Sequence, residues 1–252
     1  MTNVVTLRTV EIGAGRPKIA VSIAGQEIEQ VRQELQRVLT EGRSETGWDI
    51  DLIEIRMDMF SSVTQRETVR LLLDVLRKDN PSLPFLFTYR SKQEGGKGTL
   101  SEDAYGQLLL WAAESGAVDA IDVEGLHYQE NAPGWIAQIH ERGVYVVVSY
   151  HDAKKTPENM DVILQRLSAC GGDIVKLAVM ANSTEDACRL AVASRKFTEQ
   201  FCQPIISMAM GEMGRTTRIC LEKTGSSVTF GAIGTPSAPG QIPVKELVPW
   251  IK

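Results

Sequence analysis

Short apolar runs rich in β-branched residues recur along the whole chain, about every 30 residues, which is the length of one strand–helix unit. Each run is short enough to form a buried strand. The predicted strands cover residues 18–24, 48–56, 84–90, 118–124, 144–152, 173–180, 204–210 and 228–234. The segments between them predict an alternating α/β topology with parallel strands.

Three of the intervening segments carry clear helix signals. Residues 28–42 have apolar positions at helical spacing, and Gly42 stands at the predicted end. A second helix is predicted to begin after Ser101 and to close at Gly116. A third begins after Ser183, where the acidic residues that follow suit a helix N-terminus.

The length of 252 residues allows two small domains or one barrel. The alternation alone also allows an open, doubly wound sheet. Eight strand–helix units within about 250 residues favour a single (β/α)8 TIM barrel, so we predict one domain over residues 1–252. Residues 4–13 alternate between apolar and polar side chains and predict a β-hairpin that closes the barrel floor.

Composition limits the classes of partner and the cellular compartment that we expect for this chain. The net charge of −5 lacks the basic bias of a nucleic-acid binder, so no nucleic-acid partner is expected. No apolar run reaches the ~18 residues of a transmembrane helix, so no membrane partner is expected, and the N-terminus lacks a secretory signal. The four cysteines form no C-x-x-C pair, which is typical of reduced thiols in a cytoplasmic protein.

Charged residues occupy alternate positions of the predicted strands. Glu54 and Arg56 share the face opposite Ile53 and Ile55, because successive side chains of a strand point to opposite faces. Similar alternation places further polar residues on such faces: Ser22, Arg90, Asp122, Glu124, Ser149, His151 and Lys176. The apolar faces should pack on the helices, so the polar faces point into the barrel, where active sites lie near the C-terminal strand ends. A buried ion-pair network that only fixes strand register is the alternative.

Lys176 is the most informative single position, because it stands in the middle of an apolar strand. Lysines are rarely buried unless they are paired. Burial, together with the cations Arg56 and Arg90 pointing into the same space, favours the neutral amine, which attacks carbonyl groups to form a Schiff base. His151 ends the neighbouring strand and can transfer protons near neutral pH.

Motifs for other chemistries are absent from the sequence. It contains no phosphate-binding loop, no dinucleotide fingerprint and no H-E-x-x-H motif. No set of His and Cys residues has the spacing of metal ligands, so we expect no metal site.

Six segments in order resemble the type I 3-dehydroquinases, the Schiff-base 3-dehydroquinate dehydratases, over essentially the whole chain. They are EIR at 54–56 with Asp58, FTYRSKQEGG at 87–96, VSYHDAKKTP at 148–157, IVKLAVM at 174–180, ISMAMGEMGRTTR at 206–218 and TFGAIGTPSAPGQI at 229–242. The resemblance implies a (β/α)8 barrel, commonly a homodimer, with no metal or organic cofactor. It also implies a hydro-lyase of the shikimate pathway that converts 3-dehydroquinate to 3-dehydroshikimate.

The same resemblance implies the roles of individual residues. The family's Schiff-base lysine matches Lys176, its catalytic histidine matches His151, and the glutamate partner of that histidine matches Glu94. Its substrate-binding residues fall on Ser22, Glu54, Arg56, Arg90, Arg218, Phe230, Ser237 and Gln241. Arg215 is an alternative to Arg218 for binding the substrate carboxylate, and residues 234–242 are expected to form a lid.

Two other functions remain open from the residues alone. One is a different Schiff-base barrel enzyme, such as a class I aldolase, in which Arg218 would bind a phosphate instead of a carboxylate. The other is a noncatalytic barrel that binds a metabolite, although the combination of Lys176, His151 and Glu94 argues against it.

Overall fold

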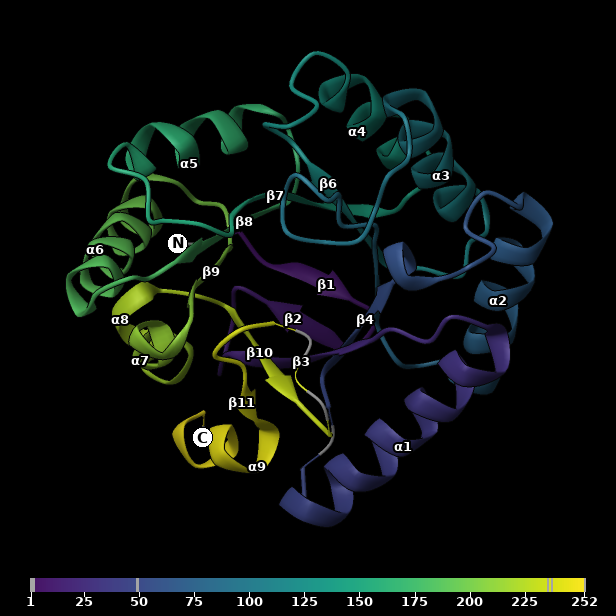
Figure 1. Ribbon diagram of the computed structural model, residues 1–252, viewed down its shortest axis with the longest axis horizontal. Coiled ribbons are helices and arrows are strands. Elements are labelled where there is room, and N and C mark those ends of the chain that lie inside the picture. Colours follow the sequence, from purple (N-terminus) through teal and green to yellow (C-terminus); the bar gives the residue numbers. More distant parts are fainter. Residues whose placement is uncertain (1–2, 49, 235, 237, 252) are drawn as a thin grey trace.

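A computed structural model describes residues 3–48, 50–234, 236 and 238–251. Its main sheet is parallel and curls into a barrel surrounded by helices (Figure 1). In spatial order its strands are β11 (Ile242–Pro243), β10 (Val228–Ala232), β3 (Lys18–Ile23), β4 (Leu52–Arg56), β5 (Phe85–Thr88), β6 (Ala120–Glu124), β7 (Tyr145–Asp152), β8 (Ile174–Met180) and β9 (Ile205–Met210).

The helices form an outer layer around this sheet (Figure 1). They are α1 (Ile28–Thr46), α2 (Arg66–Asp79), α3 (Glu102–Glu114), α4 (Ala132–Glu141), α5 (Met160–Ala169), α6 (Thr184–Gln200), α7 (Arg215–Ile219), α8 (Leu221–Thr224) and α9 (Val244–Leu247). Short 3-10 helices are η1 (Met57–Met59), η2 (Glu212–Gly214) and η3 (Val248–Trp250).

The sheet returns on itself between β9 and β10. The two strands meet at a parallel bridge that pairs Ile205 with Ser226, and the backbone N–H of Ser227 donates to the carbonyl of Ile205 at 2.8 Å. The prediction of a barrel over an open sheet is therefore confirmed, and all eight predicted strands are present as β3 to β10. The two-residue strand β11 was not predicted.

Two helices begin at the predicted side-chain caps, whereas one predicted helix end differs. Ser101 caps α3 by accepting the Ala104 N–H, and Ser183 caps α6 within a capping box, as predicted. The predicted end of α1 at Gly42 is wrong, because the helix continues to Thr46 and ends at Gly47, whose φ is 65°. Gly42 serves packing instead: a Cβ there would approach Ile233 and Ile50 to 3.0–3.3 Å.

The strand faces divide as the alternation predicted. Ile53, Ile55, Val175, Leu177 and Phe87 are at most 1% exposed and belong to the large core cluster between sheet and helices. Their neighbours in sequence point inward, so the barrel interior is lined by the opposite face of every strand.

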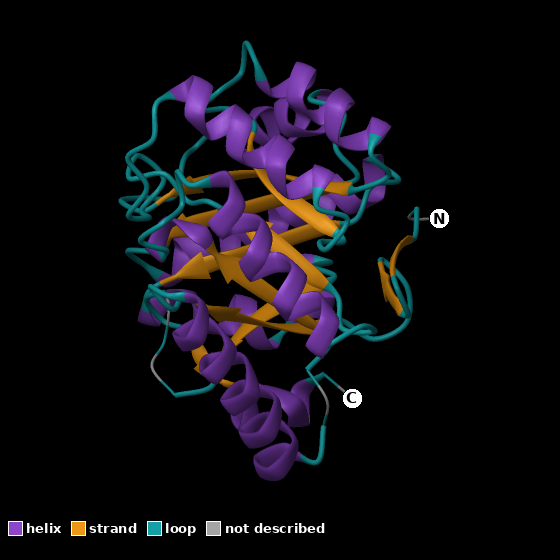
Figure 2. Cartoon of the chain, turned by 90° about the vertical axis from the view of Figure 1, so that its right-hand side faces the viewer, coloured by secondary structure: helices purple, strands orange, loops and turns teal. Residues whose placement is uncertain are grey.

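The N-terminal hairpin closes the floor of the barrel, as predicted. Strands β1 (Val5–Leu7) and β2 (Val10–Ile12) pair antiparallel, and Figure 1 shows them across the middle of the ring of strands. In the side view they lie beyond one end of the sheet (Figure 2). Leu7 and Ile12 are at most 2% exposed and pack against inward side chains of the barrel. An ion pair of 2.8 Å between Arg8 and Asp119 ties the hairpin turn to the barrel.

Inward side chains form two successive sets along the strands. The first, which we call the floor set, packs on the hairpin and is wholly apolar: Ala20, Leu52, Leu86, Ala120, Val147, Ile174, Ile206 and Val228. The second, the mouth set, stands two residues further along each strand: Ser22, Glu54, Thr88, Asp122, Ser149, Lys176, Met208 and Phe230. The interior therefore changes from apolar to mostly polar within two residues of strand.

Candidate active site

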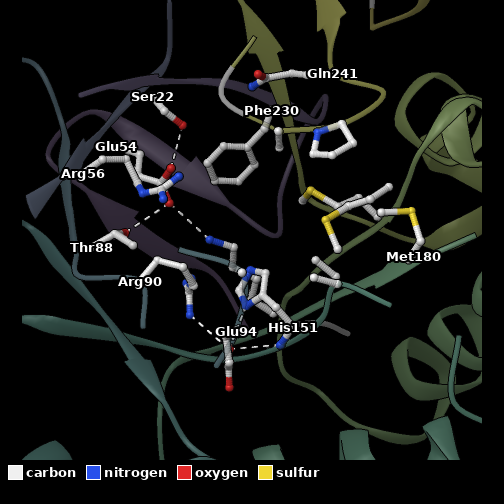
Figure 3. A pocket seen from close by; sticks show the side chains of 18 of the residues that line it. Ser22, Glu54, Arg56, Thr88, Arg90, Glu94, His151, Met180, Phe230 and Gln241 are labelled. Carbon is white, nitrogen blue, oxygen red and sulfur yellow. Dashed lines mark hydrogen bonds and ion pairs between the residues drawn. The ribbon is translucent and has the colours of Figure 1, made fainter. Parts of the chain in front are cut away.

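A cavity of about 200 Å³ opens above the mouth set, at the C-terminal ends of the strands (Figure 3). The structure brings ten of the predicted site residues to its wall: Ser22, Glu54, Arg56, Arg90, Glu94, His151, Lys176, Arg218, Phe230 and Gln241. Ser237, the remaining predicted residue, lies outside the described residues. The position of this cavity is the one at which barrel enzymes build their active sites.

Lys176 is 4% exposed and its ammonium group has two carboxylate partners. Nζ lies 3.2 Å from Oε1 of Glu54 and 3.1 Å from Oδ2 of Asp122, and 4.7 Å from the ring centre of Phe230. The prediction named Arg56 and Arg90 as the charges near this amine, and the structure adds two carboxylates in direct contact with it. The amine therefore lies at the cavity wall within a buried cluster of opposite charges.

Glu54 is held by hydroxyl groups as well as by cations. Ser22 Oγ donates to Oε2 at 2.6 Å, and Thr88 Oγ1 donates to Oε1 at 3.1 Å. Burial acts to raise the pKa of Glu54, but the charges of Lys176 and Arg56 outweigh it and lower that pKa. Glu54 is therefore ionised at neutral pH and can accept further hydrogen bonds from hydroxyl groups in the cavity.

His151 is fixed by Glu94, which comes from the loop after β5. Glu94 Oε2 lies 2.9 Å from His151 Nδ1 and also accepts the backbone N–H of His151 at 3.0 Å and Arg90 Nη1 at 3.1 Å. Since this oxygen already accepts from two donors, we assign the imidazole hydrogen to Nδ1. That tautomer leaves Nε2 bare to accept a proton.

Electrostatics keep the imidazole of His151 uncharged. Burial, followed by the cations Arg90 and Lys176, places the pKa of His151 well below its ordinary value. Burial, followed by the carboxylate of Glu124, raises the pKa of Glu94, so Glu94 is a weakened counter-charge for an imidazolium. Both effects favour a neutral base at neutral pH.

Arg90 pairs with the carboxylates that contact His151 and Lys176. Its Nη1 lies 3.1 Å from Glu94 and 2.9 Å from Glu124, and its Nη2 lies 2.8 Å from Asp122. Glu94 contacts His151 and Asp122 contacts Lys176, so one buried guanidinium holds the partners of both side chains. A bidentate pair between Arg56 and Asp58, at 2.8 and 2.9 Å, fixes the neighbouring wall.

Arg218 is a buried cation without a carboxylate partner among the described residues. It is 1% exposed, and the hydrogen bonds of its guanidinium to described residues go to Met208 Sδ and the carbonyl of Pro239, both at 3.5 Å. Burial lowers the pKa of Arg218 to about 10. Arg215 instead points to the surface, where it pairs with Glu246 at 3.4 Å. Of the two alternatives, Arg218 is the one at the cavity, and an anion there would supply its missing counter-charge.

Residues after β10 cover one side of the cavity. Ala238, Pro239 and Gln241 line it, and Gln241 Nε2 donates to the carbonyl of Gly231 at 3.0 Å. The backbone N–H of Gly211 donates to the Pro239 carbonyl at 3.2 Å, which ties this segment to the loop after β9. The predicted lid segment thus contacts the cavity through its described residues.

Sequence reasoning placed Asp122 and Glu124 on the polar face but gave them no role. Both are fully buried, and Asp122 contacts Lys176 directly. The strand order could have indicated this contact. β6 and β8 flank β7, so their inward residues at the same height approach each other. Strand alternation placed Met180 on the same face as Lys176. The thioether groups of Met208 and Met210 on the wall were missed, since methionine in a strand is typical of ordinary core.

The described residues contain neither a candidate metal site nor a helix that could span a membrane. No group of three or more His, Cys, Asp or Glu side chains there has an arrangement that could hold a metal ion. None of the described helices has both the length and the apolar character to cross a membrane.

Known proteins are similar to this chain over nearly its whole length. Residues 19–250 match the family model for type I 3-dehydroquinase. A curated 3-dehydroquinate dehydratase from Shigella dysenteriae is 39% identical over 246 residues, which span 96% of this chain and 95% of that protein.

Solved structures agree in fold as well as in sequence. The 3-dehydroquinate dehydratase from Geobacillus kaustophilus has a TM-score of 0.92 at 32% identity, covering 99% of this chain and 95% of that one. The type I 3-dehydroquinate dehydratase from Clostridium difficile has a TM-score of 0.89 at 36% identity, covering 99% and 96%. The chain therefore belongs to the type I 3-dehydroquinase family.

Proposed function

We propose that this chain is a hydro-lyase that dehydrates 3-dehydroquinate to 3-dehydroshikimate, a step of the shikimate pathway, through a Schiff base on Lys176. The observation that carries the proposal is the buried amine of Lys176 in the wall of a cavity that also presents a neutral His151. Membership of the family supports the choice of substrate.

The first stage forms the covalent intermediate. The Lys176 ammonium loses a proton, and the resulting amine attacks the C3 ketone of 3-dehydroquinate to give a carbinolamine. His151 transfers the protons that convert the C3 hydroxyl into water, and departure of that water leaves a protonated imine. The imine nitrogen then accepts electrons from the neighbouring carbon.

The second stage eliminates the C1 hydroxyl. His151 Nε2 removes a proton from C2, and the electron pair of that C–H bond moves toward the imine nitrogen to give an enamine. The enamine expels the C1 hydroxyl, which takes the proton from His151 and leaves as water. Hydrolysis of the imine consumes one water, releases 3-dehydroshikimate and regenerates the amine, so the net reaction is the loss of one water.

The remaining cavity residues suit the polar groups of the substrate. Arg218 lacks a counter-charge among the described residues and would bind the carboxylate through two parallel hydrogen bonds. Glu54 and Arg56 would hold ring hydroxyls and orient the ring for proton transfer. Contacts with Ser22, Arg90, Phe230, Ser237 and Gln241 belong to the same proposal.

Residues 234–242 form a lid in this proposal. Pro239 and Gln241 already line the cavity, and the Pro239 carbonyl accepts from both Gly211 N–H and Arg218. Closure would exclude water while the imine is present and would place Ser237 and Gln241 against the substrate.

Borohydride trapping tests the proposal directly. Incubation with 3-dehydroquinate and borohydride should add the reduced substrate to the peptide that carries Lys176, read by mass spectrometry. The Lys176→Ala variant should remain unmodified. Lys18 offers a matched control, because it is also buried but lies at the floor end, where its Nζ donates to the carbonyls of Ala14 and Arg16. Folded Lys18→Ala should still be trapped.

The same incubation separates the alternatives. A class I aldolase would cleave a carbon–carbon bond, whereas the proposed reaction releases 3-dehydroshikimate with the carbon skeleton intact. A binding protein would give neither a product nor an adduct. Absence of the adduct from the Lys176 peptide of the native protein would refute the imine mechanism.

The proposal extends to assembly and location. Residues 1–252 are proposed to fold as one domain and to pair as a homodimer, the assembly common in this family. Light scattering of the purified protein would measure the mass of the assembly. The proposed location is the cytoplasm, and the four free thiols of Cys170, Cys188, Cys202 and Cys220 suit a reducing compartment.

A further inference from the structure

Asp122 is placed behind the reactive lysine and away from the cavity. It lies on β6, is fully buried and is not among the residues that line the cavity. Its Oδ2 nevertheless lies 3.1 Å from Nζ of Lys176, so it reaches a reacting atom from the protein side.

The orientation of this carboxylate is fixed by two other contacts. Ser149 Oγ donates to Oδ1 at 2.6 Å, and Arg90 Nη2 lies 2.8 Å from the same oxygen. Burial acts to raise the pKa of Asp122, but the charges of Arg90 and Lys176 outweigh it and hold that pKa far below its usual range. Oδ2 is thus a permanent negative charge aimed at Nζ.

Glu54, the other carboxylate near Nζ, stands in a different position. It lines the cavity, where a substrate hydroxyl can compete for its oxygens. A bound substrate would therefore add partners to Glu54, whereas Asp122 does not line the cavity and is held by Ser149 and Arg90. Asp122 is thus the carboxylate whose contact with Nζ does not compete with a substrate hydroxyl.

We infer that Asp122 is the counter-ion of the protonated imine on Lys176, an inference that rests on the proposed function. The imine nitrogen carries one hydrogen and a positive charge, and that N–H would donate to Oδ2 of Asp122. When His151 takes the C2 proton, the electron pair neutralises the nitrogen to an enamine, and the charge returns before hydrolysis. The carboxylate favours the protonated imine over the neutral imine, and only the protonated form is an effective electron sink.

The same carboxylate has an opposite effect on the resting amine. It favours the ammonium form, which must lose a proton before attack. Removal of its charge should therefore make Lys176 more reactive as an amine and less effective as an imine. A residue with a purely structural role would not divide these two properties.

Glu124 provides the matched control. It lies on the same strand and the same face, is equally buried, and pairs with Arg90 at 2.9 Å. Its other hydrogen bond is to the backbone N–H of Ser91 rather than to Lys176. Asp122→Asn and Glu124→Gln make the same chemical change in one ion cluster, but only the first touches the reacting nitrogen.

The experiment measures reductive methylation of Lys176 by formaldehyde and cyanoborohydride against pH, without substrate, together with kcat for 3-dehydroquinate. In Asp122→Asn the half-maximal methylation rate should move to lower pH, while kcat falls about 100-fold, as for the loss of one preorganised electrostatic contact. Glu124→Gln should keep the native pH dependence of methylation. An unchanged dependence in Asp122→Asn, or an equal shift in Glu124→Gln, would overturn the inference.

A second variant keeps the test decisive if Asp122→Asn does not fold. Asp122→Ala leaves space for a small carboxylate, so added formate should raise its kcat several-fold, whereas it should not raise that of Glu124→Ala. No rescue by formate would count against the counter-ion. Failure of the proposed function is a separate result, since the native protein would then give no borohydride adduct with 3-dehydroquinate.

Discussion

The floor set and the mouth set occupy the same face of the same strands, two residues apart, and have opposite chemistry. The floor set is apolar and packs on the hairpin residues Leu7 and Ile12. The mouth set holds the buried charges of Glu54, Asp122 and Lys176. A step of two residues along each strand thus separates the part of the barrel that stabilises the fold from the part that forms the active site.

The two sets contribute differently to the free energy of unfolding. A large apolar side chain contributes about 1.5–3 kcal/mol when it is buried. A buried ion costs several kcal/mol of desolvation, which its partners offset only when their geometry is good. The short distances around Lys176 and Arg90 meet that condition, so the mouth set is tolerated rather than stabilising. Changes at the floor should therefore lower stability and leave activity intact, whereas changes at the mouth should lower activity.

The largest expected effect comes from replacing Lys176 of the mouth set by an apolar residue like those of the floor set. Lys176→Met removes the proposed nucleophile, and turnover should fall by at least about 10⁴-fold. It also leaves Glu54 and Asp122 without their shared cation, which should cost about 3 kcal/mol of stability. Steady-state kinetics and urea unfolding measure the two losses. Turnover within tenfold of the native rate would remove Lys176 from the mechanism.

The converse change acts on the floor alone. Ile12→Ala opens a cavity beneath the floor set and should lower the free energy of unfolding by about 3 kcal/mol. The folded fraction should keep kcat within about twofold, because the hairpin lies at the opposite end from the cavity. Val4→Ala is the control, since Val4 is 48% exposed and should change stability by less than about 0.5 kcal/mol. A large fall in kcat for Ile12→Ala would show that the two ends are coupled.

The sequence predicts this division well, because it depends on strand alternation. Apolar residues at positions such as 53 and 55 require a helix-covered face, so the intervening Glu54 must point inward. The hairpin is also predictable, since its alternating residues have only the barrel floor to cover. In these cases the local pattern and the tertiary packing require the same arrangement.

Other features depend on contacts that no local pattern contains. The position of Glu94 beside His151 depends on how a loop folds back across two strands, and only the family resemblance indicated it. The contact of Asp122 with Lys176 needs the register of three strands. Gly42 looked like a helix end because glycine often ends helices, but the packing of Ile50 and Ile233 against it decides its role.

Substitution of Arg218 tests whether a buried charge near the mouth set lowers the stability of the fold while it binds the substrate carboxylate. Arg218→Met removes a buried cation that has no carboxylate partner among the described residues, so stability should rise by about 1 kcal/mol. Loss of the charged hydrogen bonds to the substrate carboxylate should raise KM by about 10- to 100-fold. Arg215→Met, at a surface site, should leave both KM and stability nearly unchanged. Equal effects of the two variants would contradict the assignment of the carboxylate to Arg218.

The smallest expected effect is a pH dependence of stability that the mouth has and the floor lacks. The pKa of His151 lies well below its ordinary value of about 6.5, which the unfolded chain retains. Between these two values the unfolded chain binds one more proton than the native chain at this residue. The free energy of unfolding should therefore fall as pH falls below about 6.5, by up to about 1.4 kcal/mol per pH unit from His151 alone.

Urea unfolding of three proteins between pH 5 and pH 8 isolates that contribution. His151→Gln should show a shallower acid slope than the native protein, because its side chain does not titrate. Ile12→Ala should lower the whole curve without changing its slope, since the floor set contains no titratable group. If His151→Gln kept the native slope, the imidazole would titrate alike in both states, and the neutral base assigned to the mouth would lose its support.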